Sequence, residues 1–424
     1  MNIHRRVLCL IWLGLLLEAC IASPPPFRCS DPIGCVTVAP GAALHFGVLQ
    51  TLSGGSAPGG EEQKNAIRLA LAKRNDQLLG HPIKLQIEDE HCSSEGGANG
   101  ALTIVADRQT IGIWGTNCSS AAVAAAPIMS EAGLVMVSSA NTSPVLTSVS
   151  GKAGDAWHEG YFRVSWNDTQ MGRAAAVFAF QKLDVTRAAV INAGDAYSKG
   201  LTDAFAQVFQ KLGGEVVSEV VIDEDESDQQ PVLDAVALSG AELIFFPLSH
   251  PVTGSQIVQQ ARETKGLEKA LFIAGEGMLS DVFIQKAGAA GVGVYILGPA
   301  TLDSAADQQV YADYKTMFGQ PPPSIYYSFA YDAVNFLLSG VSSVAMQEPD
   351  GTLHIGRQAL RTALYATSDF DGVTGRLRCD PFGDCGVAHF NIVHLDDAGM
   401  SAAELRANVV DTFQQEDLPQ EERK

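Results

Sequence analysis

The chain alternates short apolar runs with longer stretches of helical periodicity, and it repeats this alternation in two successive blocks. In the first block Ile83, Leu85 and Ile87 alternate with polar residues, as a strand requires. Ile67 and Leu71 instead recur four residues apart, the spacing that places side chains on one face of a helix. Repeated β-α-β units of this kind predict a parallel sheet with helices packed against it.

A second block, from about residue 161, repeats the same order of strands and helices. The chain has 424 residues, of which 46% are hydrophobic, and this is enough apolar material for two cores rather than one. Aromatic residues make up only 7%, a composition that suits sheets packed closely against helices. The expected fold class is therefore α/β with two lobes, each a parallel sheet flanked by helices.

The first twenty residues have the form of an export signal. Arg5 and Arg6 precede the apolar run 7–17, which is too short to span a bilayer comfortably. The run leads into Leu-Glu-Ala-Cys, which looks like a bacterial lipobox whose cysteine, Cys20, becomes lipidated after cleavage. The alternative is ordinary signal cleavage nearby, for example after Ala22. Both alternatives predict an exported protein of the cell envelope or periplasm, and the first adds a lipid that anchors it to a membrane.

Six cysteines remain once Cys9 in the signal peptide and Cys20 are set aside. An even number of cysteines in an oxidising compartment predicts disulfides, here three. Two pairs are local, Cys29–Cys35 and Cys379–Cys385, and each encloses an Asp-Pro step and a glycine that let the loop turn back. A metal site is the weaker alternative, because neither pair has the two-residue spacing of zinc knuckles.

Charge and motifs argue against several classes of function. The chain has 28 Lys and Arg against 48 Asp and Glu, a formal net charge of -20, so nucleic acid would be repelled. The sequence contains no P-loop, no H-E-x-x-H zinc motif and no G-x-S-x-G nucleophile motif. We therefore expect no catalysis, no cofactor and no metal site.

Polar loops follow the predicted strands of the first block. Ser119 lies where the run 111–115 leads into a helix, so a carboxylate could bind its hydroxyl and the free backbone N–H groups beside it. The alternative is that Ser119 or Ser120 caps its own helix. After the next strand, Thr142 offers a hydroxyl and the backbone near Ala140 a carbonyl, the mixture that an ammonium and a carboxylate need.

The second block contributes an acid and aromatic hydroxyls. Glu276 is a lone acid flanked by glycines at the end of a predicted strand, where it could pair with an ammonium group. The alternative is a solvated loop charge. Tyr197 and Tyr326 could supply hydroxyl groups and aromatic walls to a pocket.

These stretches together resemble the type I periplasmic binding proteins, closest to their leucine/isoleucine/valine-binding branch. The resemblance covers the chain from about Leu44 to Phe390. In the first loop this chain departs from the pattern, because SGGSAPGG replaces a segment with a tyrosine. The resemblance rests on GVLQTLSG, on GTNCSSAAVAAAPIMSEAGLVMVSSANTSPVLT, on INAGDAYSKGL, on FIAGEG and on FAYDAV.

The resemblance implies roles for the six candidate residues. Ser119 matches a serine that binds the ligand carboxylate, and the stretch from Ala140 to Thr142 matches one that binds both ends of an amino acid. Tyr197 and Glu276 match residues of the other lobe, with the glutamate taking the ammonium. Tyr326 stands where an aromatic wall is expected. The resemblance also implies a disulfide between Cys92 and Cys118.

The implied function is that of the solute-binding component of an ABC importer. Such a protein, expected to be monomeric, captures an amino acid between its lobes and delivers it to an ABC permease. Branched-chain and other small amino acids, amides, urea and short peptides all stay open as ligands. An envelope lipoprotein that senses or regulates a membrane partner is the alternative, and an exported hydrolase would lack a nucleophile–base pair.

The same resemblance, combined with the predicted elements, implies an organisation in which the chain crosses between lobes at hinge segments. The expected parts are a signal peptide (1–19), a lipid anchor and Pro-rich spacer (20–35), an N-terminal lobe (36–166 and 299–370), a C-terminal lobe (167–298 and 371–410) and a disordered tail (411–424).

Overall fold

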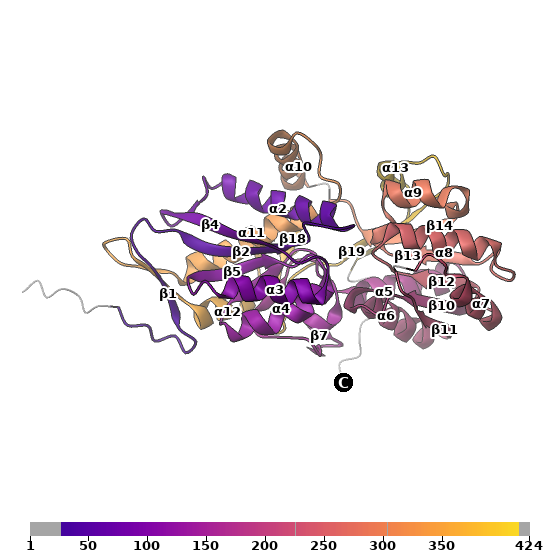
Figure 1. Ribbon diagram of the computed structural model, residues 1–424, viewed down its shortest axis with the longest axis horizontal. Coiled ribbons are helices and arrows are strands. Elements are labelled where there is room, and N and C mark those ends of the chain that lie inside the picture. The colour runs from indigo at the N-terminus through magenta and orange to yellow at the C-terminus, as the bar shows by residue number, and fades with distance from the viewer. Residues whose placement is uncertain (1–26, 225, 303, 415–424) are drawn as a thin grey trace, which may run out of the picture. The chain divides into compact units, whose positions relative to one another are not determined.

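The computed structural model describes residues 27–224, 226–302 and 304–414. The predicted signal peptide and Cys20 lie outside the described residues. Two large sheets, each flanked by helices, make up the protein, so the predicted two-lobed α/β fold is confirmed (Figure 1). Across these described ranges, no helix is both long and apolar enough to cross a membrane.

The sheet of the first lobe has six strands in the order β3-β4-β2-β5-β6-β9. The five strands from β4 to β9 pair in parallel, and β3 pairs antiparallel with β4 at the edge. The strands are β2 (Leu44–Gln50), β3 (Gln77–Leu78), β4 (His81–Asp89), β5 (Thr110–Gly115), β6 (Val135–Ser138) and β9 (Tyr161–Arg163), and the helices of this lobe are α2 (Ala57–Ala72), α3 (Ser94–Val105), α4 (Ser119–Glu131), α10 (Ala305–Phe318), α11 (Tyr326–Val344) and α12 (Arg357–Tyr365).

Alternation along the strands divides this core between the two faces of the sheet. Trp114 in β5 turns toward α11, where its indole N–H donates to the carbonyl of Ala333 at 3.2 Å. Its neighbour Ile113 turns to the other face and packs with residues of α3 and α4, as period-two alternation requires. In Figure 1, α2 and α11 accordingly lie on one side of the strands and α3 and α4 on the other.

The sheet of the second lobe has seven strands in the order β11-β10-β12-β13-β14-β19-β20. The first five pair in parallel, whereas β19 and β20 join antiparallel. The strands are β10 (Arg187–Asn192), β11 (Glu215–Val221), β12 (Leu243–Phe246), β13 (Leu271–Ala274), β14 (Val294–Pro299), β19 (His389–His394) and β20 (Val409–Gln414), and the helices are α5 (Asp168–Val177), α6 (Ala196–Leu212), α7 (Gln230–Ser239), α8 (Pro251–Glu263), α9 (Asp281–Ala287) and α13 (Ala402–Ala407).

Both sheets order their parallel strands 2-1-3-4-5 along the chain. In sheets of this topology ligands bind beyond the carboxyl ends of the strands, where the strand order reverses. We therefore expect a ligand site at the turns after β5, β6, β10 and β13. Small sheets complete the structure: β1 (Cys35–Val38) with β15 (Met346–Gln347) and β16 (Leu353–Gly356), β7 (Ser148–Val149) with β8 (Lys152–Ala153), and β17 (Phe370–Gly372) with β18 (Gly375–Leu377).

The last crossing between lobes lies later than predicted. We assigned residues 371–410 to the second lobe, but the part before β19 is bound to the first. Asp332 in α11 accepts hydrogen bonds from the N–H and the hydroxyl of Thr374, at 2.9 and 2.6 Å. Arg163 at the end of β9 forms an ion pair with Asp384, Nε to Oδ1, at 2.8 Å. These long-range contacts hold the segment before β19 on the first lobe, although β19 itself follows in the chain and belongs to the second lobe.

Two other predicted boundaries also shift. The spacer predicted over 20–35 ends too late, because the Asp31 carboxylate accepts the N–H groups of Gln358 and Ala359, at 3.1 and 3.0 Å, in the first turn of α12. A carboxylate suits this position, since helix N-terminal N–H groups lack partners within the helix. The tail predicted from residue 411 begins too early, because β20 extends to Gln414 and pairs with β19.

Candidate functional site

Ser119 is the first residue of α4, directly after the turn that follows β5. The N-cap residue of this helix is Cys118, which makes no side-chain capping bond. Ser119 is buried, and its Oγ accepts a hydrogen bond from the backbone N–H of Ser143 at 3.4 Å. The alternative in which Ser119 caps α4 is therefore wrong, and its hydroxyl faces the loop after β6.

Ala140 and Thr142 lie in that loop. Ser138, the last residue of β6, holds it in place because its Oγ accepts the N–H groups of Ala140 and Asn141, at 3.2 and 2.9 Å. The hydroxyl of Thr142 is buried and donates to Oδ2 of Asp168 at 2.7 Å. The first-lobe residues singled out from the sequence thus lie in adjacent loops at the carboxyl end of the sheet.

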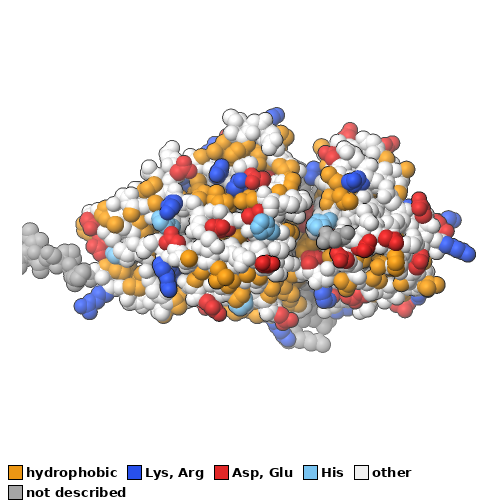
Figure 2. All heavy atoms as spheres, in the orientation of Figure 1, with side chains coloured by type: hydrophobic (Ala, Val, Ile, Leu, Met, Phe, Trp, Pro, Cys, Tyr) orange, Lys and Arg blue, Asp and Glu red, His pale blue; other side chains and the backbone are white. Residues whose placement is uncertain are grey.

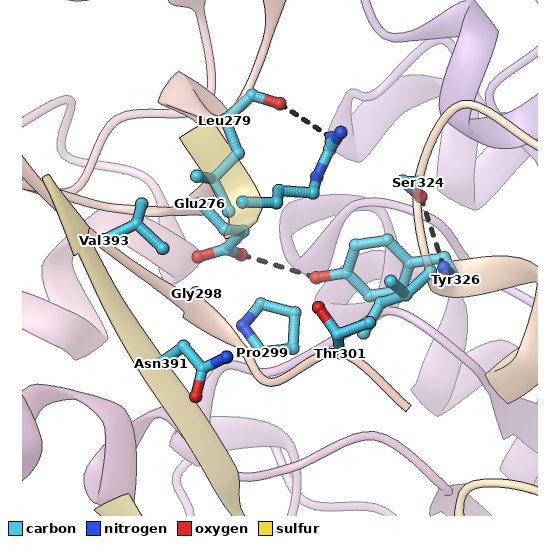
Figure 3. Close-up of a pocket in the computed structure, with 11 residues that line it drawn as sticks. Glu276, Leu279, Gly298, Pro299, Thr301, Ser324, Tyr326, Asn391 and Val393 are labelled. Carbon is cyan, nitrogen blue, oxygen red and sulfur yellow. Dashed lines mark hydrogen bonds between the residues drawn. The ribbon is translucent and has the colours of Figure 1, made fainter. Parts of the chain in front are cut away.

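Glu276 follows β13 in the second lobe, at the start of the short 3-10 helix Glu276–Met278. The hydroxyl of Tyr326, which begins α11 in the first lobe, donates to Oε1 of Glu276 at 3.4 Å, and Figure 3 shows the two side chains pointing toward each other. The Tyr326 ring stacks on Trp166 with centroids 5.8 Å apart. The predicted acid and the predicted aromatic wall therefore meet between the lobes.

Tyr197 approaches the same place from the first turn of α6. Its hydroxyl is shielded from solvent and makes no well-formed hydrogen bond with any described residue. A Cβ on Gly275 would lie 3.0 Å from this hydroxyl and 3.1 Å from the backbone of Pro247, so a side chain there would crowd the site. A glycine therefore suits position 275, next to Glu276, because Tyr197 and Pro247 lie too close to leave room for a larger side chain.

Asp168 was missed by the sequence analysis. It is fully buried at the start of α5, and its Oδ2 accepts the Thr142 hydroxyl. Its Oδ1 makes no well-formed hydrogen bond with a described residue, although the Trp166 side chain interacts with the carboxyl. The pattern that indicated Ser119 and Thr142, a polar residue shortly after a strand, also applies to Asp168. Asn167 and Asp168 follow directly after the apolar run 161–166 that opens the second block.

Burial and mutual repulsion dominate the electrostatics of these groups. Burial, and then the negative charge of Glu276, raise the pKa of the Asp168 carboxyl well above its usual range. Burial likewise raises the pKa of Glu276. The pKa values of Tyr197 and Tyr326 are raised well above the ordinary value, first by burial and then by Glu276. These four groups therefore offer hydrogen-bond acceptors and no positive charge of their own.

A cavity of about 50 Å3 lies beside Glu276 and Tyr326 (Figure 3). In the chain that the structure describes, no group of three or more His, Cys, Asp or Glu side chains could hold a metal ion. The cavity is lined by Glu276, Leu279, Gly298, Pro299, Thr301, Ser324, Ile325, Tyr326, Asn391, Val393 and Arg406.

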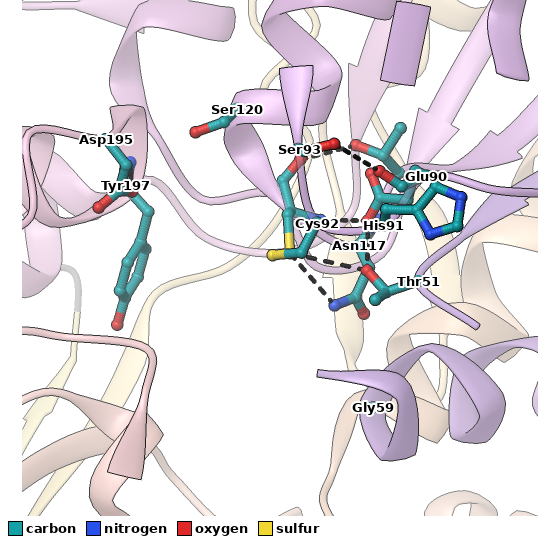
Figure 4. The surroundings of a disulfide bond; sticks show 12 residues. Thr51, Gly59, Glu90, His91, Cys92, Ser93, Asn117, Ser120, Asp195 and Tyr197 are labelled. Atoms are coloured by element: carbon teal, nitrogen blue, oxygen red, sulfur yellow. Dashed lines mark hydrogen bonds between the residues drawn. A yellow bond between two sulfur atoms is a disulfide. The ribbon is translucent and has the colours of Figure 1, made fainter. Parts of the chain in front are cut away.

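A disulfide between Cys92 and Cys118 supports the loop that carries Ser119 (Figure 4). Behind it, Oε1 of the buried Glu90 accepts the backbone N–H of Cys118 at 2.9 Å, that of Asn117 at 3.2 Å and the Thr51 hydroxyl at 2.6 Å. The carboxylate thus organises the turn between β5 and α4.

A second disulfide joins Cys379 and Cys385, as the local spacing predicted. The pairing of Cys29 with Cys35 stays a prediction.

Comparison with known proteins identifies the family to which this fold belongs. The sequence model of the family described as "Periplasmic binding protein" matches residues 43–398. An amino acid binding protein of Pseudomonas aeruginosa is 26% identical over 365 residues, covering 84% of this chain and 91% of that protein.

Solved structures share the fold. A leucine binding protein from Thermotoga maritima superimposes with a TM-score of 0.73 at 22% identity, covering 89% of this chain and 100% of that one. A solute binding protein of an ABC transporter from R. palustris, in complex with benzoate, gives a TM-score of 0.69 at 21% identity, covering 89% and 99%. Because the family match spans most of the chain, this protein belongs to the type I periplasmic binding proteins, in their leucine/isoleucine/valine-binding branch.

Proposed function

We propose that this chain is the solute-binding component of an ABC importer, and that it captures a small amino acid between its lobes and delivers it to a membrane permease. The observation that carries the proposal is the pair of acids Glu276 and Asp168. Each has a carboxylate oxygen that is shielded from solvent and makes no well-formed hydrogen bond with a described residue, although Tyr197 interacts with Glu276 and Trp166 with Asp168. Buried polar atoms are nearly always hydrogen-bonded, so such oxygens mark the place of a donor that binds there.

An ammonium group fits this place better than any neutral or anionic group. The charged form of a buried carboxylate is costly unless a cation accompanies it, and here the negative charge of Glu276 adds to the cost of ionising Asp168. Benzoate, which occupies the R. palustris relative, would bring a third negative charge and no cation. We therefore favour a solute with a protonated amine.

The other end of an amino acid has donors in the first lobe. The Ser119 hydroxyl and the backbone N–H groups of the first turn of α4 could donate hydrogen bonds to a carboxylate, because helix N-termini attract anions. Ala140 and Thr142 in the neighbouring loop would fix the orientation. The 3.4 Å hydrogen bond from Tyr326 to Glu276 connects the lobes at this point, so closing them would enclose the amine end.

Delivery to a permease follows from the family and from the predicted export. A lipid on Cys20 would hold the protein at a membrane, and Cys20 lies outside the described residues. We propose no chemical step, since the arrangement offers acceptors and donors for binding without an activated nucleophile.

The test begins with a thermal-shift screen of the unfolded and refolded protein against the twenty amino acids, small amides, short peptides and benzoate. The best amino acid is then compared with its analogue lacking the amine, by calorimetry in buffers of different ionisation enthalpy. We expect the amine to contribute about 1.5–3 kcal/mol, typical of hydrogen bonds to charged groups. Binding should release protons near neutral pH, because an ammonium favours the ionised form of carboxyls whose pKa values are raised.

Two outcomes would contradict the proposal. Equal affinity for the amine-free analogue, or proton uptake on binding, would show that the acids do not face a cation. No response to any solute would favour the alternative of a lipoprotein that regulates a membrane partner.

A further inference from the structure

Arg406 joins the turn that carries Glu276 to the turn that carries Tyr326. Its Nη2 donates a hydrogen bond to the carbonyl of Leu279 at 2.7 Å and another, at 3.4 Å, to the carbonyl of Pro323. Leu279 ends the 3-10 helix that begins with Glu276 in the second lobe, whereas Pro323 precedes α11 in the first lobe. One guanidinium group therefore connects the two lobes beside the candidate site.

The helix that carries Arg406 is held firmly on the second lobe. α13 begins with a capping box, in which the Ser401 hydroxyl oxygen accepts the N–H of Glu404 at 3.2 Å and the Glu404 carboxylate accepts the N–H of Ser401 at 2.8 Å. The carboxylate of Asp281, at the start of α9, accepts the N–H of Ala402 at 2.7 Å and ties α13 to α9. Arg406, in the last turn of α13, thus extends toward the first lobe from a fixed base.

The buried Glu62 fixes the other end of this contact, on the first lobe. From α2, its Oε1 accepts the backbone N–H of Tyr327 at 2.9 Å, and its Oε2 accepts the N–H and the hydroxyl of Ser324, at 3.1 and 2.7 Å. A carboxylate suits the start of α11, because the first N–H groups of a helix lack partners within it. Burial raises the pKa of Glu62 to about 7, while these hydrogen bonds and the positive charge of Arg406 act in the opposite direction. Glu62 and Arg406 therefore attract each other across the lobes.

The surroundings of Arg406 belong to both lobes. Its side chain forms part of the wall of the cavity of about 50 Å3 beside Glu276. Figure 3 shows Glu276 and Leu279 on one side of this cavity and Ser324 and Tyr326 on the other. On the face shown in Figure 2, a narrow groove separates the two lobes. A contact that crosses from lobe to lobe here holds the cavity closed.

We propose that Arg406 is a positioning residue for solute capture, which stabilises the arrangement in which the lobes enclose the amine end of the solute. The inference rests on the proposed function, because closure is the step that traps an amino acid. When the lobes separate, the hydrogen bond from Arg406 to Pro323 breaks and Glu62 loses its nearby cation. The bond to Leu279 lies within the second lobe and stays. Arg406 therefore favours the closed form over the open form and slows release of the solute.

The test compares R406Q with R262Q, two variants that each remove one arginine from the second lobe. Arg262 is a matched control, because its Nη1 also donates to two carbonyl groups, those of Glu268 and Ala270, at 3.2 and 2.9 Å. Both of these carbonyl groups belong to the same lobe as Arg262. Circular dichroism and urea titration measure the folding and stability of each variant. We expect both variants to fold with some loss of stability, and only R406Q to change the release of the solute.

Stopped-flow mixing with each of the twenty amino acids in turn measures association and release. Tryptophan fluorescence reports closure, because Trp166 stacks on Tyr326 where the lobes meet. We expect R406Q to release the bound amino acid about tenfold faster, a loss of about 1.4 kcal/mol, with an unchanged association rate because the solute enters the open form. R262Q should match the unaltered protein in both rates. Unchanged release in R406Q, or an equal change in R262Q, would overturn the inference.

Hydrogen exchange of the solute-free protein provides a readout that does not depend on the solute. Mass spectrometry follows the backbone N–H groups of residues 276–280 in the second lobe and 324–327 in the first. R406Q should speed exchange in both segments together, whereas R262Q should change neither. If no amino acid binds the unaltered protein but R406Q still speeds exchange in both segments, the proposed function is wrong and the closure role of Arg406 stands. Unchanged exchange in R406Q would refute the closure role, whether or not an amino acid binds.

Discussion

Glu276 carries a carboxylate oxygen that is shielded from solvent and makes no well-formed hydrogen bond with a described residue, although Tyr197 interacts with the carboxyl, while its other oxygen accepts the Tyr326 hydroxyl. If this carboxylate receives an ammonium group, E276Q keeps the shape of the side chain and removes its charge. We expect affinity for the amino acid found in the screen to fall by about 1.5–3 kcal/mol, measured by calorimetry. The exposed E268Q is the control, and equal affinity in E276Q and E268Q would remove Glu276 from the site.

Glu90 makes stability depend on pH. Burial raises the pKa of its carboxyl to about 7. Because the folded-state pKa lies above the unfolded value, the folded protein binds the proton more tightly, and this stabilisation is full below about pH 4.5 and lost as the pH rises through 7. In E90Q this contribution is absent, so the free energy of unfolding of the unaltered protein relative to E90Q should rise by up to about 3 kcal/mol between pH 8 and pH 5.

Urea titrations at pH 5, 6, 7 and 8 measure this difference. E88Q, a change two residues away on the same strand, provides the control and should keep the pH profile of the unaltered protein. Parallel profiles for E90Q and the unaltered protein would mean that Glu90 does not titrate in this interval.

At the scale of elements, the disulfide Cys92–Cys118 ties the loop after β4 to the start of α4, and its ends are 26 residues apart along the chain. Removing a cross-link of this span frees the unfolded chain, so C92S/C118S should lower the free energy of unfolding by about 3–4 kcal/mol. Solute affinity should fall as well, since the next residue is Ser119. Urea titration and calorimetry measure the two effects.

The disulfide Cys379–Cys385 offers the matched control, because its cysteines are only 6 residues apart along the chain and neither of them is next to Ser119 in sequence. C379S/C385S should cost about 2 kcal/mol in stability and leave solute affinity unchanged. An equal loss of affinity in both variants would mean that the loop before α4 has no special dependence on its disulfide.

At the scale of the whole molecule, the buried pair Arg163–Asp384 joins the end of β9 to the segment that leads into the second lobe. D384N leaves the Arg163 guanidinium buried without its counter-ion, and we expect a loss of about 3–5 kcal/mol in urea titrations. The double variant R163M/D384L replaces both charges with apolar groups and should recover much of that loss. A double variant no more stable than D384N would show that the ion pair is not what D384N disrupts.

Much of the fold and part of the site were predictable because they depend on residues close in sequence. Alternating Ile83, Leu85 and Ile87 and helical repeats such as Ile67 and Leu71 predicted the β-α-β order, since periodicity reports which face of an element is covered. Ser119 and Thr142 could be singled out as candidates because a strand end and the loop after it are consecutive in the chain. The chain by itself thus determined its elements, its two-lobed class and the candidate loops.

The tertiary structure decided which of these loops face one another. Asp168 and Glu276 are 108 residues apart along the chain, and neither their proximity nor the raised pKa of each can be inferred from local sequence. The placement of the segment before β19 with the first lobe depends on Asp332 and Arg163, far away in sequence. Periodicity carries no information about such contacts, because they form only when distant elements pack together and exclude water.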